Sequence, residues 1–313
     1  GLLQPCIVMP GVSRLGETPR PARVAPLLVS LRPDQWTKNL IVFAGLVFGE
    51  RLLDLEALGR STATFAVFCA LSSAMYLFND VVDRERDRLH PRKCRRPIAA
   101  GRVSAPAALL VAVSLLGVGA AGAFWLQFPL GLLALAFAGL LGLYSRVLKK
   151  LVILDVMVIA IGFVLRAVAG AVVLSAPISQ WLLVCTLLGA LFLALTKRRQ
   201  EVAELGVNAG QHRGVLHHYT PHLLDQMVTI AAAATLVSYA VWASGAETVE
   251  KFGTNLLTLT IPFPIYGVLR YLLVAQDPSA GLGPSEILLR DRPIAVCVAT
   301  WGVAVAVIIY RPF

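Results

Sequence analysis

Long runs of apolar residues leave this 313-residue chain very few possible folds. The clearest of them span residues 109–124, 130–143, 156–174, 181–195 and 294–309. Many approach the roughly 20 residues that an α-helix needs to cross a bilayer, whereas a soluble helical core would need polar faces on its outer helices. Only 15% of the residues are charged, against about 25% in a typical soluble domain. The sequence therefore predicts an all-α, polytopic membrane helix bundle.

The distribution of Lys and Arg predicts the orientation of this bundle. We expect nine spans, at residues 40–53, 60–79, 105–125, 128–145, 152–174, 180–197, 224–244, 255–274 and 292–310. Basic residues gather on alternate connections, and the connection between the second and third spans holds eight of them. The positive-inside rule then predicts a multi-pass protein of the plasma (inner) membrane, with its N-terminus and charged loops in the cytoplasm. Because topology accounts for most of the net charge of +10, we expect no nucleic-acid partner.

The chain is predicted to form one domain. Residues 1–26 are rich in proline and basic side chains, and we expect a flexible N-terminal tail there. Residues 27–313 are expected to form a single transmembrane domain that carries the candidate catalytic residues. The five cysteines show no paired spacing, so neither a disulfide framework nor a zinc site is indicated. The oligomeric state stays open, and a homo-oligomer is compatible with the sequence.

The stretch NDVVDRERD, residues 79–87, gathers acidic side chains on one face of a helix. Asn79, Asp83 and Asp87 are spaced i, i+4, i+8, and Asp80 lies three residues before Asp83. Mg²⁺ prefers oxygen ligands and is typically held by one or two carboxylates together with substrate phosphates. Asp80, Asp83 and Asp87 are therefore predicted metal ligands for a diphosphate carried in as its magnesium complex. The alternative is a solvated helix end whose acids pair with neighbouring arginines.

A basic loop follows this acidic stretch directly. Its side chains Lys93, Arg95 and Arg96 offer charged hydrogen-bond donors to phosphate oxygens. The acids also adjoin the apolar residues 65–78, at the mouth of the membrane, where ionisable groups are costly and tend to be functional. Acids for a metal beside bases for phosphates predict a site at which a phosphate group is transferred or leaves.

NDVVDRERD has the form NDxxDxxxD and resembles the first aspartate-rich motif of the UbiA superfamily of intramembrane prenyltransferases. Six further segments are similar to those of its phosphoribosyl branch: LRPDQWTKN (31–39), DRLHPRKCRRPIAAG (87–101), YSRVLKK (144–150), LRAVAG (165–170), LFLALTKRRQE (191–201) and LLRDRP (288–293). The loop at 87–101 and the last segment are the ones that point to this branch. The resemblance covers about residues 31–310 and implies a UbiA-like bundle of about nine transmembrane helices.

This resemblance implies a Mg²⁺-dependent transfer of 5-phosphoribose from phosphoribosyl diphosphate to a polyprenyl (decaprenyl) phosphate, for the synthesis of cell-wall arabinan precursors. Asp80, Asp83 and Asp87 are expected to hold Mg²⁺ on the leaving diphosphate, with Asn79 bonded to an oxygen or a metal-bound water. The substrate-binding residues that it implies are Lys38, Asn39, Lys93, Arg95, Arg96, Tyr144, Lys149, Asp155, Arg166, Lys197, Arg198, Arg290 and Asp291.

Two other functions compete with this interpretation. Prenyl-diphosphate users of the superfamily carry a second acidic motif, DxxxD, and the equivalent stretch LKKLVILDVMVIAIGF has only Asp155. This departure counts against an aromatic prenyltransferase that uses a polyprenyl diphosphate. A carrier of lipids or anions would bind at the bilayer midplane through broken helices or inverted repeats, and we find neither pattern in the sequence.

Several of the expected site residues keep a structural alternative. Arg166 shares a helix face with Asp155 and lies deep in an apolar run, so it needs either an ion-pair partner or a lipid phosphate. Tyr144 and Lys149 are equally well explained as interface anchors of a membrane helix, and Asp291 as half of a surface ion pair. A metal role is not expected for the loop histidines, which are His212, His217, His218 and His222.

Overall fold

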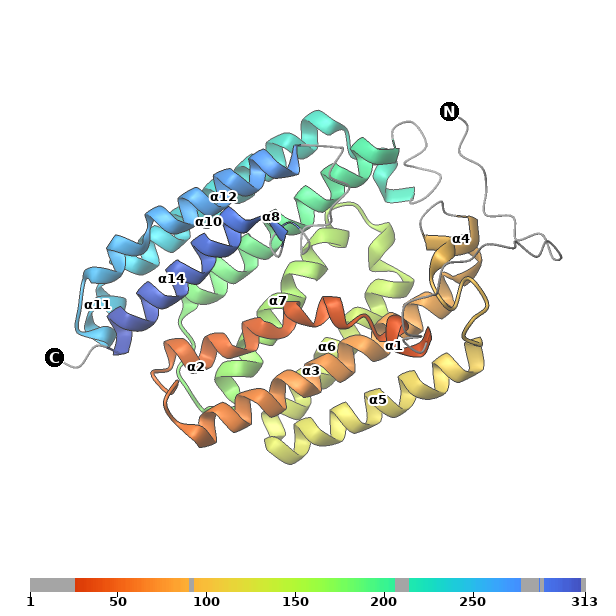
Figure 1. Cartoon of the computed structure of the whole chain (residues 1–313), viewed down its shortest axis with the longest axis horizontal. Coiled ribbons are helices and arrows are strands. Elements are labelled where there is room, and N and C mark those ends of the chain that lie inside the picture. Colours follow the sequence, from red (N-terminus) through yellow and green to blue (C-terminus); the bar gives the residue numbers. More distant parts are fainter. Residues whose placement is uncertain (1–25, 90–92, 206–213, 277–286, 288–289, 311–313) are drawn as a thin grey trace, which may run out of the picture.

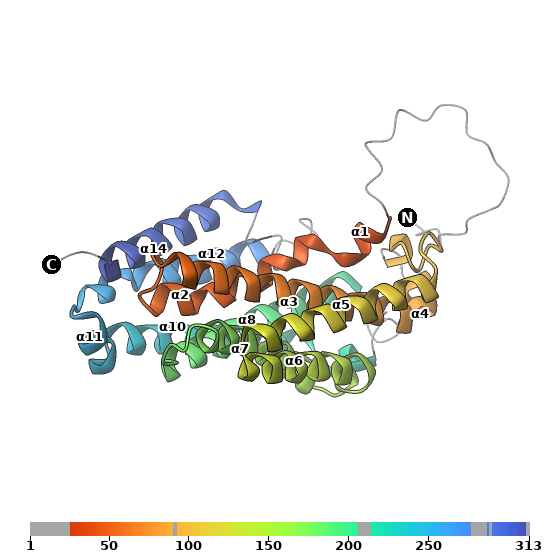
Figure 2. The ribbon, with the colours of Figure 1, turned by 90° about the horizontal axis from the view of Figure 1, so that it is seen from below.

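Residues 26–89, 93–205, 214–276, 287 and 290–310 are described by a computed structural model, drawn in Figures 1 and 2. Within these ranges the chain forms helices and no β-strand, which confirms the all-α prediction. The two views show long helices lying side by side in an elongated slab. The expected flexible tail lies outside the described residues, except for Pro26 at the start of the first helix.

Eight helical segments of the described residues are long and apolar enough to cross a membrane, so the chain is a multi-pass integral membrane protein. They are α3 (Leu55–Val82), α5 (Ala105–Leu126), α6 (Phe128–Arg146), α7 (Leu154–Val172), α8 (Gln180–Leu205), α10 (Pro221–Ser244), the pair of η6 (Leu256–Thr260) and α12 (Pro262–Ala275), and α14 (Arg292–Tyr310). The spans expected from the second to the ninth are all present at these places.

The first expected span takes a different form, because it is not one continuous α-helix. Residues 40–53 hold the end of the 3₁₀ helix η1 (Pro33–Phe43), the short helix α2 (Ala44–Phe48) and the turn residues after it, and α1 (Pro26–Leu31) precedes η1. Proline disfavours helical geometry in the residue before it, and Arg32 has a φ of 54° at the break between α1 and η1. The three pieces together lie alongside α3 (Figure 1). The N-terminal segment thus lies along the bundle as a helix that is broken at Arg32.

Two glycines let this broken helix approach α7 closely. A Cβ atom added at Gly45 of α2 would lie 2.5 Å from the carbonyl oxygen of Gly170 in α7, and one added at Gly170 would collide with the Val42 carbonyl. Since only glycine lacks this atom, the two backbones touch here. The contact lies one turn from Arg166 and brings the N-terminal segment against that residue.

The helix α7 connects two hydrophobic cores. One core joins α7 to η1, α2, α3, α5 and α6, and contains Phe68 packed 5.1 Å from Phe137, ring centre to ring centre. The other joins α7 to α8, α10, α12 and α14, and contains Phe192 packed 5.3 Å from Tyr271. Both ends of α7 therefore have fixed neighbours. Short segments lie between the long helices: α4 (Arg84–Leu89), η2 (Lys93–Arg95), η3 (Leu148–Lys150) and η5 (Gly214–His218).

Candidate active site

The acidic stretch lies where α3 passes into α4. Asp83 is the residue between the two helices, with a φ of −90° and a ψ of 4°. The Asp83 amide still donates to the Asn79 carbonyl, and the Asp87 amide donates to the Asp83 carbonyl, each at 2.9 Å. Because these bonds have the i to i−4 pattern of an α-helix, the acids keep helical spacing across the junction.

Asp80 and Asp87 share one arginine. Nη1 of Arg96 donates to Oδ1 of Asp80 at 3.1 Å and to Oδ2 of Asp87 at 2.6 Å. Asp80 also accepts from Nη2 of Arg32 at 2.5 Å. Both carboxylates are buried, at 3% and 4% exposure. Burial raises the pKa of Asp87 above its ordinary value, and the charge of Arg96 opposes that rise.

Asp83 pairs with a base from another part of the chain. Nζ of Lys149, in η3, lies 2.8 Å and 2.7 Å from the two carboxylate oxygens of Asp83. Each of the three acids thus has a neighbouring cation as its ion-pair partner. We call this group the charged cluster; it consists of Asp80, Asp83, Asp87, Arg32, Arg96 and Lys149.

The charged cluster suits a metal ion that arrives with a substrate. Within the described residues, no group of three His, Cys, Asp or Glu side chains converges closely enough to hold a metal alone. However, Asp80 and Asp87 lie close enough to contact the same nitrogen of Arg96. Mg²⁺ needs only one or two carboxylates when substrate phosphates supply further oxygens. The donor set therefore fits Mg²⁺ carried in on a diphosphate.

The other predicted residues near the cluster take varied positions. Asn79, Lys93 and Tyr144 are half-buried, while Arg95 is exposed on η2. The carbonyl of Arg95 accepts a hydrogen bond from Nη2 of Arg102 at 2.6 Å. The structure therefore distinguishes two adjacent arginines, because the Arg96 side chain bonds to the acids and the Arg95 side chain faces outward.

Arg166 forms hydrogen bonds and a cation–π contact inside the bundle. Its Nε donates to Oδ1 of Asn39 at 2.6 Å, and its Nη1 donates to the Gly162 carbonyl at 2.9 Å. The guanidinium carbon also lies 4.5 Å from the centre of the Phe137 ring, a cation–π contact. Arg166 is thus paired with an amide and a ring, whereas Asp155 pairs with Arg198. Lys38, half-buried in η1, lies within electrostatic range of Arg166, as well as of Lys197, Arg32 and Asp34.

Asp155 belongs to a separate network, which we call the sealed network: Asp155, Arg198, Glu201 and Tyr219. Oδ2 of Asp155 lies 2.9 Å from Nε of Arg198, and neither side chain is more than 2% exposed. Arg198 also pairs with Glu201. The Tyr219 hydroxyl donates to Oδ1 of Asp155 at 2.8 Å. Burial raises the pKa of Tyr219 to about 12, so the hydroxyl keeps its proton at neutral pH.

The last predicted segment lies apart from both networks. Asp291 accepts from Nη2 of Arg270 in α12 at 2.9 Å, and from the Ile294 amide at 3.0 Å, which caps α14. The hydrogen bond from Arg270 lowers the pKa of Asp291. Its partner is therefore Arg270, while Arg290 is exposed. Lys197 is also an exposed residue, on α8.

Three residues of these networks were not among the site residues predicted from the sequence: Arg32, Glu201 and Tyr219. No spacing rule predicts the contact of Arg32 with Asp80, since 48 positions separate the two residues. The one sequence signal at Arg32 is its position directly before a proline in LRPDQWTKN. Tyr219 lies beside the histidines that drew attention to its loop. Of those, His217 and His218 are exposed, Nε2 of His222 lies 3.2 Å from Gln226, and His212 is outside the described residues.

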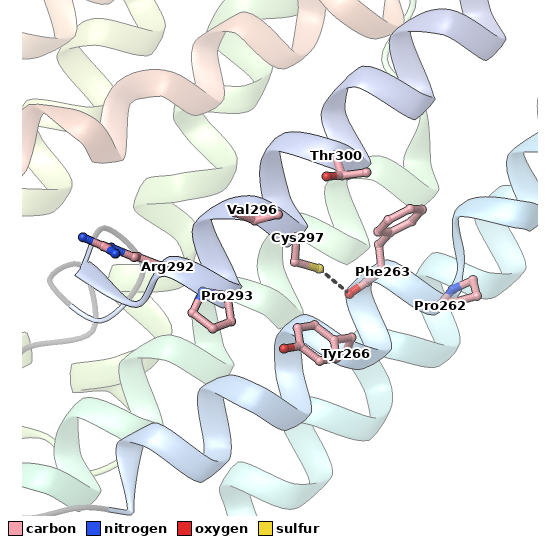
Figure 3. Close-up of a pocket in the computed structure, with 8 residues that line it drawn as sticks. All are labelled: Pro262, Phe263, Tyr266, Arg292, Pro293, Val296, Cys297 and Thr300. Atoms are coloured by element: carbon pink, nitrogen blue, oxygen red, sulfur yellow. Dashed lines mark hydrogen bonds between the residues drawn. The ribbon is translucent and has the colours of Figure 1, made fainter.

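A groove of about 640 Å³ lies between α12 and α14 (Figure 3). In this view Cys297 points toward Phe263, to whose carbonyl its Sγ donates at 3.3 Å. No member of the charged cluster lines the groove. Its lining residues are Pro262, Phe263, Tyr266, Arg292, Pro293, Val296, Cys297 and Thr300. The groove is thus a feature of the C-terminal helices and not part of the candidate active site.

The apolar helices and the charged cluster together define a membrane protein with a group of paired ionic side chains where α3 passes into α4. The model of the UbiA prenyltransferase family matches residues 40–282, and the chain therefore belongs to that family, as the sequence motifs predicted. It is a transferase of this family by descent.

Curated relatives are similar over nearly the whole chain. The decaprenyl-phosphate phosphoribosyltransferase of Mycobacterium tuberculosis is 35% identical over 293 residues, which cover 90% of this chain and 95% of the relative. The protein with the same name from Mycolicibacterium smegmatis is 33% identical over 298 residues, with 92% and 93% covered. This level of sequence identity supports membership of the family, whereas the names describe the two relatives.

Solved structures share the fold. A UbiA homologue from Archaeoglobus fulgidus bound to GPP and Mg²⁺ superposes with a TM-score of 0.69 at 20% identity, and the match covers 91% of this chain and 99% of that one. An apo UbiA homologue from Aeropyrum pernix K1 gives a TM-score of 0.58 at 17% identity, covering 90% and 98%. The predicted UbiA-like bundle is therefore confirmed.

Proposed function

We propose that this protein transfers 5-phosphoribose from phosphoribosyl diphosphate to a polyprenyl phosphate and releases diphosphate. An oxygen of the lipid phosphate attacks C1 of the ribose. The bond between C1 and the diphosphate oxygen breaks, and its electron pair leaves with the diphosphate. The attacking phosphate is already ionised near pH 7, so the reaction needs no strong general base. The protein contributes position and charge neutralisation.

The observation that carries this proposal is the difference between the two acidic positions. Prenyl-diphosphate users are expected to have a second acidic motif, and this chain has Asp155 at that place. Asp155 is fully buried and paired with Arg198, so it is not available to a second metal. The acids of the charged cluster, in contrast, pair with partly exposed bases. A single group of this kind suits a donor with one metal-bound diphosphate and an acceptor with a monophosphate.

The charged cluster supplies both kinds of group that such a donor needs. Asp80, Asp83 and Asp87 would hold Mg²⁺, which when bound neutralises the charge that develops on the leaving diphosphate. Arg96 and Lys149 neutralise these acids in the free protein. With the acids occupied, the two cations would bind phosphate oxygens instead, since charge-assisted hydrogen bonds to phosphate are among the strongest that side chains form.

Two further observations support the proposal. The relatives from Mycobacterium tuberculosis and Mycolicibacterium smegmatis are named for this donor group and a decaprenyl phosphate acceptor. The basic connections α4, η2 and η3 adjoin the charged cluster. By the positive-inside rule, we propose that the cluster faces the cytoplasm, where a soluble sugar phosphate can reach it.

The test is a transfer assay on the purified protein. Labelled phosphoribosyl diphosphate, Mg²⁺ and polyprenyl phosphates of several lengths should give a labelled lipid, and EDTA should stop the reaction reversibly. A prenyl diphosphate with a phenolic acceptor should give no product. Prenylated phenol, together with no labelled lipid, would replace this proposal with an aromatic prenyltransferase.

A further inference from the structure

The segment between Lys149 and α7 contains a strained turn. Ile153 has a φ of 69° and a ψ of −47°. The Leu154 amide donates to the Val152 carbonyl at 2.8 Å, so Ile153 is the centre of a γ-turn with positive φ. Such turns are rare and strained, and a β-branched residue at positive φ is an outlier. A local arrangement of this kind persists only where the surrounding structure enforces it.

The surrounding structure supplies one side-chain hydrogen bond to this turn. The Ile153 amide donates to the Tyr219 hydroxyl at 2.7 Å. Ile153 is an exposed residue, at 51%, so it is not held by burial in the core. The Tyr219 hydroxyl in turn donates to Asp155 at 2.8 Å, and Asp155 is paired with Arg198 of α8. The hydroxyl thus connects the turn to the sealed network.

The same turn determines where Lys149 lies. Only three residues separate Lys149 from Ile153. They continue from the 3₁₀ helix η3, in which the Lys150 and Leu151 amides donate to the Val147 and Leu148 carbonyls. This short, bonded segment cannot absorb a change at Ile153 within itself. A flip of Ile153 to negative φ would therefore redirect η3 and withdraw Lys149 from Asp83.

We propose that Tyr219 is a positioning residue, whose hydroxyl holds the γ-turn at Ile153 and thereby keeps Lys149 against Asp83. Tyr219 bonds to the turn itself, through the Ile153 amide, and this bond is its route to the charged cluster. The kinetic part of this inference rests on the proposed function. The position of Lys149 does not, and it can be measured directly.

The first experiment measures how accessible Lys149 is in the intact protein. Acylation of lysines, followed by mass spectrometry, reports Lys149, which is paired with Asp83, and Lys150, which is exposed and serves as the internal reference. In Tyr219→Phe, the Lys149 labelling rate relative to Lys150 should rise roughly tenfold, equivalent to about 1.4 kcal/mol in the loop equilibrium. Unchanged protection of Lys149 in Tyr219→Phe would overturn the inference.

The second variant separates a positioning role from a general loss of stability. Glycine accepts positive φ without a Cβ clash, so Ile153→Gly added to Tyr219→Phe should restore most of the protection of Lys149. Without that rescue, the effect of Tyr219 does not pass through the turn and the inference fails. Tyr239→Phe is the matched control, because it also removes a buried hydroxyl, bonded to Thr260 and Trp301. It should lower Tm and leave Lys149 protected.

Turnover supplies the kinetic readout. Tyr219→Phe should lower kcat/KM for phosphoribosyl diphosphate roughly tenfold without changing the KM for the lipid phosphate, and Ile153→Gly should recover most of this loss. If wild-type protein shows no phosphoribosyl transfer, the proposed function fails, while the labelling experiment still decides the role of Tyr219. If transfer occurs and Tyr219→Phe matches wild type, the positioning role is wrong.

Discussion

Asp87 and Asp155 are both buried aspartates that pair with an arginine, but their surroundings differ. Asp87 shares Arg96 with Asp80, and the Arg96 side chain is 27% exposed. Asp155 faces Arg198, whose side chain is 2% exposed, and the Tyr219 hydroxyl occupies its other oxygen. The bases of the charged cluster can leave their acids for water or a ligand, whereas both members of the Asp155–Arg198 pair are shielded from water.

This difference explains how one membrane protein can use buried charges for two purposes. Removing one partner of a fully buried ion pair leaves an uncompensated charge, so such pairs are costly to break. A pair with a partly exposed base is easier to open, because water replaces the lost contact. We therefore expect changes in the charged cluster to alter activity and changes in the Asp155–Arg198 pair to alter stability, while Tyr219 affects activity through the turn at Ile153.

The largest expected effect is on turnover, from Asp83→Asn. This change keeps the shape of the side chain and removes the charge that a metal-bound diphosphate needs. Turnover should fall roughly a thousandfold, as when a major electrostatic group of an active site is lost. Labelled-lipid formation measures the loss, and Tm should stay near that of wild type. Near-normal turnover in Asp83→Asn would remove the metal role from the cluster.

Asp155→Ala should affect stability instead. It leaves Arg198 deeply buried with Glu201 as its remaining acid, and breaking a buried pair typically costs about 3–5 kcal/mol. Thermal unfolding in detergent should therefore show a large fall in Tm. Asp155→Leu combined with Arg198→Met is the matched control and should recover much of it, because an apolar pair of similar volume is often neutral. If Asp83→Ala lowers Tm as much as Asp155→Ala does, the two networks do not differ in the way proposed.

Local sequence patterns predicted the parts of the site that depend on short-range geometry. Helical spacing placed Asp80, Asp83 and Asp87 together, and the order of charges along the chain pointed to Arg96. Partners from distant segments could not be derived in this way, because they depend on how helices pack. Thus Asn39 as the partner of Arg166 requires the glycine contact between α2 and α7.

The form of the first span was likewise beyond the sequence pattern. Hydropathy identified residues 40–53 as membrane-associated, but the 3₁₀ geometry of η1 depends on the break at Arg32 and on packing against α7. The bond from Arg32 to Asp80 depends on that break too. Prediction therefore reached the acids and one loop base, Arg96, and missed Arg32, the base that the N-terminal segment supplies.

Arg96→Ala and Arg95→Ala compare two adjacent arginines with different contacts. Arg96 bonds to two acids, and the Arg95 side chain is exposed. Loss of a charge-assisted hydrogen bond costs about 1.5–3 kcal/mol, roughly a ten- to hundredfold effect. Donor titrations in detergent should show that loss of kcat/KM for Arg96→Ala and less than about a twofold change for Arg95→Ala, since an exposed charge is screened by solvent. Equal effects of the two changes would mean that the loop acts through its total charge.

The smallest expected effect is that of Asp291→Asn, which tests an exchangeable ion pair outside the charged cluster. Asparagine caps a helix about as well as aspartate, so this change removes the pair with Arg270 and keeps the bond to the Ile294 amide. The hydrogen bond from Arg270 lowers the pKa of Asp291 below its ordinary 3.8. A group whose pKa is lower in the folded state adds stability above its unfolded pKa and loses it as pH falls through the folded value. Wild type should therefore melt slightly above Asp291→Asn at pH 7, and the gap should close as the pH falls below about 4. A difference in Tm that persists at the lowest pH would trace the effect to the helix cap and not to the ion pair. Turnover should be the same in both proteins.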